Sequence, residues 1–403
     1  MVEWKEYRIK DLGEVVTGNT PPTSNREYYG TEYKFIKPTD MVEGQRFVST
    51  TEEYYSELAY QKYKKCLLPP KTPCVVTIGS LGKKMCLTDT ECFTNQAVNA
   101  VIPNKENDGE FLYYAFKASV LAYVKQLDSG TTSGRENVSK SSFSKIKVRV
   151  PPLPTQQKIA SILSAYDNLI QNYKKQIEAL QTAASELYKE WFVRFRFPGY
   201  QTTNFENGIP EGWKVYRIKD LCYINKKTVS SKDAKKEILY LDTGSITENV
   251  IDSFESYILE EAPSRARRIV KKNSIIFSTV RPNQNHYGIL KTVPENLIVS
   301  TGFAVFDPKF DIANILYFFL SSKDFVDYCQ MIAEGAVATY PSIKPEEIGK
   351  VKILLPTMDL AIKLNHSFES LFLRIENLKQ QITNLTQQRD LLLPRLMSGK
   401  LEV

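Results

Sequence analysis

The sequence predicts an α+β protein with two similar β-rich domains, joined by two long antiparallel coiled-coil helices and related by an internal pseudo-two-fold repeat. Three observations predict this fold: a repeated motif, short apolar runs in each half, and two long stretches with a seven-residue hydrophobic period. The chain of 403 residues is also long enough for two or more hydrophobic cores.

The repeat is clearest at the start of each half. The segment Trp4–Leu12 returns as Trp213–Leu221 with a single difference, Glu6 against Val215. A second similarity lies at the far end of each half, where Lys145–Val148 corresponds to Lys350–Ile353. Between these matching edges the halves differ, which indicates one scaffold that carries two different binding specificities.

Each half contains short strand-like runs separated by turn residues. Cys74–Ile78, Ala97–Ile102 and Ser274–Val280 are rich in β-branched and apolar residues and alternate with Gly, Pro and Asn. Glu110–Leu127 and Ile312–Met331 have the pattern of helices. The domains are therefore predicted to be mixed rather than all-β.

Two segments carry hydrophobic residues at steps of seven, with a second series four residues later. Five successive heptads in each segment favour a coiled coil over two ordinary amphipathic core helices, which are the alternative. The predicted seam residues are Ile159, Leu163, Tyr166, Ile170, Tyr173, Ile177, Leu180, Ala184, Leu187 and Trp191 in the first segment, and Leu364, Phe368, Leu371, Ile375, Leu378, Ile382, Leu385, Arg389, Leu392 and Leu396 in the second.

The order of the segments predicts that the two helices run antiparallel. The connector Phe192–Gly212 is short and rich in Pro and Gly, so the second domain lies near the far end of the first helix. The second helix follows that domain at once and must run back, which brings Leu391–Val403 near the first domain. The predicted divisions are domain 1 (1–153), helix 1 (154–196), connector (197–212), domain 2 (213–356), and helix 2 with its tail (357–403).

Composition excludes several classes of protein. The net charge of +7 tolerates an anionic partner without requiring one. The cysteines form no Cys-x-x-Cys pair and only two histidines exist, so a metal site is not expected. No secretion signal or membrane span is apparent, which favours the cytoplasm. The sequence contains no phosphate-binding loop, no Gly-x-Gly-x-x-Gly and no Asn/Asp-Pro-Pro-Tyr/Phe motif, so no catalytic residues are predicted.

The repeated organisation resembles the specificity subunits of type I restriction–modification systems over essentially the whole chain. The second half departs from the pattern, because Leu354–Leu360 lacks a Gln-Gln pair and Glu334–Tyr340 replaces a Ser-Gly-Thr stretch. Because of these departures, DNA contacts expected in one half are not assigned directly to the matching positions of the other half. The segments that carry the resemblance are Trp4–Leu12, Trp213–Leu221, Pro151–Gln157, Leu391–Leu401, and Ser129–Arg135 followed by Ser144–Lys147.

The resemblance implies a non-catalytic role in DNA recognition. Each domain would be a target-recognition domain that reads one half of a split double-stranded DNA target, and the helices would dock two methyltransferase subunits. Two restriction–translocase subunits would complete the enzyme. S-adenosylmethionine, ATP and Mg²⁺ would be bound by those partners and not by this chain. A helix of about 37 residues spans ~55 Å, which could separate the two half-sites by up to ~16 base pairs.

Phosphate contacts need basic and small polar side chains, and base reading needs Arg, Asn, Gln or Lys on loops. For each candidate the alternative is an ordinary solvated loop residue, and the run Arg281–His286 is the strongest candidate for base reading. The DNA-binding candidates are Lys83, Lys84, Arg135, Asn137 and Lys140 in the first domain, and Arg265, Arg267, Arg268, Arg281, Asn283, Gln284, Asn285, His286, Tyr340 and Lys344 in the second.

Two other functions fit parts of the sequence. An interaction scaffold would use the coiled coil to join other proteins and would have no sequence-specific affinity for DNA. A self-contained restriction enzyme would need a nuclease or methyltransferase motif, and the sequence shows neither.

Overall fold

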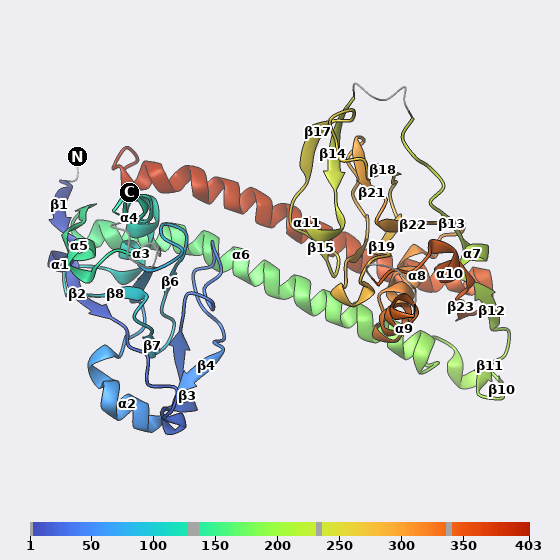
Figure 1. Ribbon diagram of the computed structural model, residues 1–403, viewed down its shortest axis with the longest axis horizontal. Coiled ribbons are helices and arrows are strands. Elements are labelled where there is room, and N and C mark those ends of the chain that lie inside the picture. The colour runs from blue at the N-terminus through green and yellow to red at the C-terminus, as the bar shows by residue number, and fades with distance from the viewer. Residues whose placement is uncertain (1–2, 128–136, 231–235, 336–340) are drawn as a thin grey trace. The chain divides into compact units, whose positions relative to one another are not determined.

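The computed structural model describes residues 3–127, 137–230, 236–335 and 341–403 (Figure 1). The chain divides into two compact units. Unit 1 comprises Met1–Tyr173 and Gln381–Val403, and unit 2 comprises Lys174–Gln380. Each unit contains one mixed domain of strands and short helices together with part of each of two long helices, so the α+β fold class is confirmed.

The domain of unit 1 is built on two small sheets. One is antiparallel with strand order β2-β8-β5-β6, and the other has the order β4-β3-β7 with β3 and β7 parallel. All four residues of β5 are buried, as expected for an apolar run at the centre of a sheet. The strands are β2 (Gly13–Thr17), β3 (Tyr29–Ile36), β4 (Glu53–Tyr55), β5 (Pro73–Val76), β6 (Met85–Leu87), β7 (Cys92–Thr94) and β8 (Val98–Pro103).

The domain of unit 2 repeats this topology. Its antiparallel sheet has the order β13-β22-β19-β20, and its second sheet has the order β17-β14-β21-β18 with β14 and β21 parallel. The predicted internal repeat is therefore present in the strand pairing as well as in the sequence. The strands are β13 (Cys222–Ile224), β14 (Glu237–Leu241), β17 (Glu255–Ile258), β18 (Ala266–Ile269), β19 (Ile275–Ser278), β20 (Tyr287–Ile289), β21 (Leu297–Ser300) and β22 (Phe303–Pro308), with a small hairpin of β15 (Ile246–Thr247) and β16 (Val250–Ile251).

The repeated motif closes each domain by pairing its first strand with its last. In unit 1, β1 (Lys5–Arg8) pairs antiparallel with β9 (Lys147–Val150). In unit 2, β12 (Lys214–Arg217) pairs in the same way with β23 (Lys352–Leu355). One helical turn follows each first strand, α1 (Ile9–Leu12) or α7 (Ile218–Leu221), and its Ile and Leu are buried in the domain core. This pairing explains why the similar segments occur at both ends of each half.

Short helices cover the sheets where the sequence predicted helices. In unit 1 they are α3 (Gly109–Ala115), a π-helical turn (Phe116–Val120) and α4 (Leu121–Gln126), and in unit 2 they are α8 (Ala313–Leu320) and α9 (Lys323–Glu334). Phe111 and Phe116 in unit 1 and Ile315 and Leu316 in unit 2 are fully buried. The remaining short helices are α2 (Glu57–Tyr63), α5 (Lys140–Lys145) and α10 (Pro345–Lys350).

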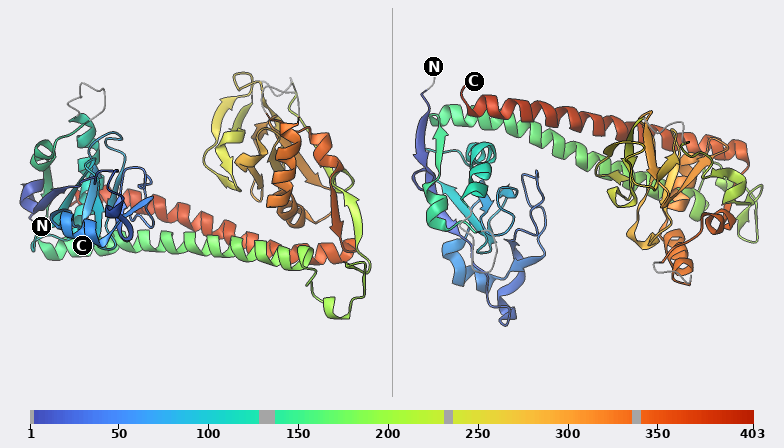
Figure 2. Two further views of the ribbon diagram at one scale, coloured as in Figure 1. Left: turned by 60° about the horizontal axis from the view of Figure 1, so that its bottom comes forward. Right: turned by 45° about the horizontal axis from the view of Figure 1, so that its top comes forward.

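Two long helices supply the rest of the core. They are α6 (Leu153–Tyr188) and α11 (Met358–Met397), and every predicted seam residue is buried or half-buried. Unit 1 takes the first part of α6 and the last part of α11, whereas unit 2 takes the last part of α6 and the first part of α11. The helices are therefore antiparallel within each unit, and Figure 2 shows α6 in green beside α11 in red.

One seam position is charged. Arg389 of α11 is only 9% exposed and forms an ion pair with Asp167 of α6, with 2.6 Å between Nη1 and Oδ1. Tyr114 of α3 donates its hydroxyl to the other carboxylate oxygen of Asp167. Burial opposes the charge of Arg389, but its bonds to Asp167 outweigh this and raise the pKa of the guanidinium. A charged pair that fits only one alignment favours a single register of the two helices.

The segments that follow the long helices cover the two equivalent tryptophans. In unit 2 a π-helical turn (Lys189–Val193) ends α6, and Phe192, Phe195 and Phe197 surround Trp213. A short hairpin of β10 (Phe205–Glu206) and β11 (Ile209–Pro210) precedes Trp213 in the chain. In unit 1 the tail beyond α11 returns to Trp4, where Gly399 lies so close that a Cβ would come within 2.6 Å of the indole Nε1. The expectation that the C-terminal tail lies near the first domain is confirmed.

Candidate nucleic-acid interface

Seven of the predicted DNA-binding residues lie on two structurally equivalent loops. Residues 77–84 join β5 to β6, and residues 279–286 join β19 to β20. The loops have equal length, because Val75 pairs with Met85 and Phe277 pairs with Tyr287 at the same spacing. Lys83 and Lys84 therefore occupy the same part of the fold as the run that ends at His286. The other predicted residues on these loops are Arg281, Asn283, Gln284 and Asn285.

A second segment lies against each loop by equivalent backbone contacts. In unit 1, Asn137 forms a bridge with Ile78, and the next amide, of Val138, donates to the Thr77 carbonyl at 2.8 Å. In unit 2, Ser342 forms the matching bridge with Val280. The next amide, of Ile343, donates to Thr279 at 2.9 Å. We call residues 78–84 with 137–140 reading edge 1, and residues 280–286 with 341–344 reading edge 2.

The predicted residues near these bridges join the reading edges. Lys140 opens α5 in unit 1, and Lys344 precedes α10 in unit 2, and both side chains are exposed. Two further predicted residues, Arg135 and Tyr340, lie outside the described residues. The fold therefore assembles segments far apart in sequence into one polar edge in each unit.

The basic cluster of Arg265, Arg267 and Arg268, which lies on β18 and just before it, is close to reading edge 2. The carbonyl of Arg265 accepts the amide of Thr301 at 2.8 Å. The residue after Thr301 is Gly302, and its carbonyl accepts the amide of Thr279 at 2.8 Å. Arg265 and Arg267 are exposed. Arg268 is half-buried, its pKa is lowered by burial, and its Nε has no hydrogen-bond partner among the described residues. The backbone of Arg265 therefore lies beside this edge, and the cluster holds two exposed guanidinium groups and one partly desolvated one.

The predicted side chains on the two loops differ in how exposed they are. Lys83, Arg281, Asn283 and Gln284 are exposed. Lys84, in contrast, donates from Nζ to the Pro38 carbonyl at 2.8 Å and is half-buried. Exposed basic and amide side chains on a loop are suited to contact phosphates and base edges.

The hairpin β15–β16 supports the loop of reading edge 2 from one side. Asn285 donates from Nδ2 to the Glu248 carboxylate at 2.9 Å, while the Glu248 amide donates to the Asn285 carbonyl at 2.9 Å. His286 contacts the Ile246 carbonyl through Nδ1 at 2.6 Å. On the other side, Gln330 of α9 accepts the amide of Asn283 at 3.2 Å. The loop is therefore held in one conformation by contacts at both of its flanks.

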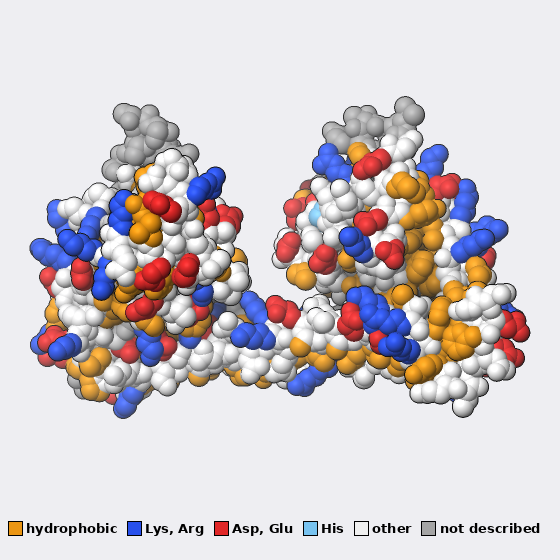
Figure 3. Space-filling model, turned by 90° about the horizontal axis from the view of Figure 1, so that it is seen from below, with side chains coloured by type: hydrophobic (Ala, Val, Ile, Leu, Met, Phe, Trp, Pro, Cys, Tyr) orange, Lys and Arg blue, Asp and Glu red, His pale blue; other side chains and the backbone are white. Residues whose placement is uncertain are grey.

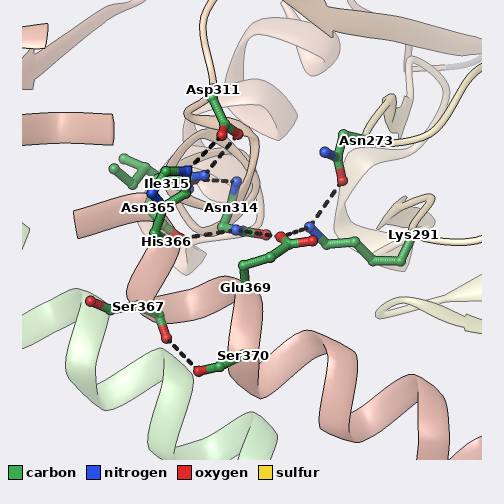
Figure 4. Close-up of polar contacts among 10 residues, drawn as sticks. All are labelled: Asn273, Lys291, Asp311, Asn314, Ile315, Asn365, His366, Ser367, Glu369 and Ser370. Atoms are coloured by element: carbon green, nitrogen blue, oxygen red, sulfur yellow. Dashed lines mark hydrogen bonds and ion pairs between the residues drawn. The ribbon is translucent and has the colours of Figure 1, made fainter. Parts of the chain in front are cut away.

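A polar cluster fixes the far end of strand β20 to helix α11 (Figure 4). Lys291 follows β20 and forms an ion pair with Glu369 of α11 at 2.7 Å, and it also donates to Asn273. Asn314 at the start of α8 donates to the same Glu369 carboxylate. Burial opposes ionisation of Glu369, but its hydrogen bonds from Lys291 and Asn314 outweigh this and lower its pKa. Because β20 begins at the reading loop, one short strand connects that loop to the long helix.

Side-chain amides attach each domain to its long helix at equivalent places. In unit 1, Gln156 of α6 is 1% exposed and accepts the amide of Asp108, which caps α3, at 2.9 Å. In unit 2, Asn365 of α11 is 1% exposed and accepts the amide of Asn314 in α8 at 2.9 Å. The second half lacks the Gln-Gln pair, and a different amide on the other helix makes the corresponding contact. The residues at this junction were missed from the sequence because their partners lie far away along the chain.

The surface of each unit carries charges of both signs. On the face that Figure 3 shows, Lys and Arg side chains are interspersed with Asp and Glu on both units. The charge on this face is therefore mixed rather than gathered in one extended basic field.

Within the described residues there is no group of three or more His, Cys, Asp or Glu that could hold a metal ion. All six cysteines are free thiols. No helix in the described ranges is both long and apolar enough to cross a membrane.

Comparison with known proteins identifies the class. The family model for the type I restriction modification DNA specificity domain matches residues 1–182 and again residues 210–388. These two matches cover most of the chain, which therefore belongs to this family. It is a DNA-specificity subunit of a type I restriction–modification system, with two target-recognition domains and a role in DNA recognition rather than catalysis.

Individual relatives agree with this assignment. The chain is 28% identical over 423 residues to the type I restriction enzyme MjaIX specificity subunit of Methanocaldococcus jannaschii, covering 100% of this chain and 94% of that protein. It is 35% identical over 175 residues to the HindI specificity subunit of Haemophilus influenzae, covering 42% of this chain and 38% of that protein. The fold is similar to the crystal structure of the type I S subunit from M. genitalium, with a TM-score of 0.62, 16% identity and coverage of 98% and 96% of the two chains.

Proposed function

We propose that reading edges 1 and 2 each contact one half of a bipartite double-stranded DNA target. The observation that carries this proposal is that two loops of equal length occupy the same place in both domains while their sequences differ. A common scaffold with different side chains at its edge is what two independent half-site specificities require.

Within each edge, the exposed side chains divide by chemistry. Lys83, Lys140 and Lys344 are suited to phosphate oxygens, because ammonium groups act as mobile point charges. Arg281, Asn283 and Gln284 are suited to base edges, since guanidinium and amide groups can form paired hydrogen bonds with guanine or adenine.

In this proposal the other components of the restriction–modification enzyme are partner subunits. Two methyltransferase subunits dock on the long helices and use S-adenosylmethionine to methylate adenine. Two restriction–translocase subunits use ATP and Mg²⁺, and the assembly acts on DNA in the cytoplasm. The family membership of this chain supports assembly with other restriction–modification subunits.

The proposal is tested by mapping adenine methylation across the genome of cells that express the chain with its cognate modification subunit. Residues 213–356 are then replaced with the corresponding domain of another family member. We expect one half of the methylated motif to change and the other half to persist. A change in both halves or in neither contradicts independent reading edges. If no motif is methylated while the partner is active with another specificity subunit, the interaction scaffold becomes the better interpretation.

A further inference from the structure

The last residue of each reading loop makes the same kind of internal contact. Lys84 immediately precedes β6 and donates from Nζ to the carbonyl of Pro38 at 2.8 Å. His286 immediately precedes β20 and places Nδ1 at 2.6 Å from the carbonyl of Ile246. Both contacts are partly buried, and both side chains are half-buried. Two different residue types thus make equivalent contacts at equivalent positions.

The acceptors lie on corresponding segments of the fold but not at the same position, because Pro38 is the second residue after β3, whereas Ile246 is the fifth residue after β14 and opens β15. Pro38 follows β3, which pairs in parallel with β7, and Ile246 follows β14, which pairs in parallel with β21. In each domain the contact therefore connects the reading loop of the antiparallel sheet to the segment that leaves the other sheet.

The chemistry of these contacts favours an internal role over DNA contact. A carbonyl oxygen can only accept, so Nδ1 of His286 carries the proton. With Nδ1 engaged at Ile246, only Nε2 of the His286 ring is left for any other partner. The ammonium of Lys84 is turned toward Pro38, whereas its neighbour Lys83 is exposed.

The side-chain contacts of Lys84 and His286 add to the backbone bonds that close each loop, in which the Lys84 carbonyl accepts the Val76 amide and the His286 carbonyl accepts the Ser278 amide. Gly79 and Arg281, at equivalent positions near the start of each loop, both have left-handed backbone conformations, with φ of +85° and +47°. Ordering a short irregular loop costs conformational entropy, and a loop ordered before DNA arrives does not pay that cost on binding.

We propose that Lys84 and His286 are equivalent positioning residues, which hold the two reading loops in their DNA-reading conformation rather than contacting DNA. This inference rests on the proposed function of the reading edges. It assigns to each half-site one side chain whose loss alters recognition of that half-site alone.

The first test compares Lys84→Met with the matched control Lys83→Met in the complex of the full chain with its modification subunit. Affinity for target DNA is measured between about 50 and 200 mM salt. Each lost phosphate contact lowers the slope of log K against log salt by about 0.9. We expect Lys84→Met to keep the wild-type slope and to weaken discrimination of the first half-site about five- to tenfold, as the loss of one hydrogen bond does. We expect Lys83→Met to lower the slope.

The second test uses His286, where the side chain can be replaced by a donor of similar reach. His286→Leu is expected to relax only the second half of the methylated motif. His286→Asn, whose amide can donate to Ile246, is expected to restore it. Melting temperatures of all variants separate loss of folding from loss of loop position.

Defined outcomes overturn the proposal. A slope reduced in Lys84→Met as much as in Lys83→Met would assign Lys84 to phosphate contact. If His286→Asn is folded but does not restore the motif, His286 is not a positioning residue. Failure of the proposed function would be recognised separately, because even the wild-type complex would then select no bipartite target.

Discussion

Arg281 combines an exposed guanidinium with an unfavourable backbone conformation. Its φ of +47° lies in the left-handed region, which costs a residue with a side chain about 1–2 kcal/mol. The equivalent position in unit 1 is Gly79, for which φ of +85° carries no such cost. Strain that persists at one site usually reflects a function of the side chain at that site. Arg281 is therefore the residue at which recognition and stability are most easily separated.

We expect Arg281→Gly to leave the protein folded and to impair reading of the second half-site. Relief of the left-handed strain and the greater entropy of glycine in the unfolded chain oppose each other, so the melting temperature should change by only a few degrees. Loss of a base contact should weaken binding of the second half-site by about 1–3 kcal/mol. Calorimetry and DNA-binding titrations measure the two effects.

The variant Arg281→Lys serves as the control for charge. It keeps the positive charge and the backbone strain but loses paired hydrogen bonding, so it should retain non-specific affinity and lose base selectivity. An unchanged methylation motif in both variants would exclude Arg281 from base reading.

At the scale of secondary-structure elements, the Lys291–Glu369 pair connects strand β20 to helix α11. The Lys291 side chain is 7% exposed and that of Glu369 is 27% exposed. Burial lowers the pKa of Lys291, and Glu369 offsets only part of this effect. Removal of the carboxylate would leave a buried ammonium group without its counter-ion.

We expect Glu369→Gln to lower the free energy of unfolding by about 2 kcal/mol at neutral pH. This is less than the ~3–5 kcal/mol for a fully buried pair, because Glu369 is partly solvated. The folded-state pKa of Glu369 is lowered, so its contribution is complete above the unfolded pKa of about 4.3 and is lost as the pH falls through the folded value. The difference between wild type and variant should therefore shrink in acid, as denaturant titrations at several pH values can measure.

The double variant Lys291→Met with Glu369→Leu is the matched control. An apolar pair of similar volume removes both charges and should recover most of the stability lost in Glu369→Gln. A double variant as unstable as the single one would show that the hydrogen bonds to Asn273 and Asn314 matter more than the ion pair.

At the scale of the whole molecule, the long helices carry a period that can be extended without changing their seam. Duplicating one heptad in each helix, residues 174–180 and 376–382, keeps the apolar series in register. Seven residues add ~10 Å to a helix, which corresponds to about 3 base pairs of DNA.

We expect this double duplication to lengthen the unspecified spacer of the methylated motif by about 3 base pairs while both half-sites stay the same. Insertion of two residues at the same places turns the seam by about 200° and should abolish a stable complex. An unchanged spacer with the heptad duplication would contradict the role of the helices in setting half-site distance. Methylation mapping provides the readout for both variants.

The sequence alone determined the features that depend on local pattern. The heptad period of α6 and α11, the repeated motif at Trp4 and Trp213, and the apolar runs that became β5 and β19 are all properties of short segments. Periodicity and side-chain type decide such features before distant parts of the chain meet. The placement of the candidate loops followed from the same strands, since both loops directly follow a buried one.

Only the tertiary structure decided which of the candidate side chains face outward. Lys83 and Lys84 are neighbours of the same type, yet one is exposed and the other is bound to Pro38, a residue 46 positions away. Gln156 and Asn365 make corresponding contacts from different helices, and Lys291 meets Glu369 across 78 positions. These outcomes depend on which donors and acceptors are brought together and shielded from water by long-range packing, and a local pattern contains no information about such partners.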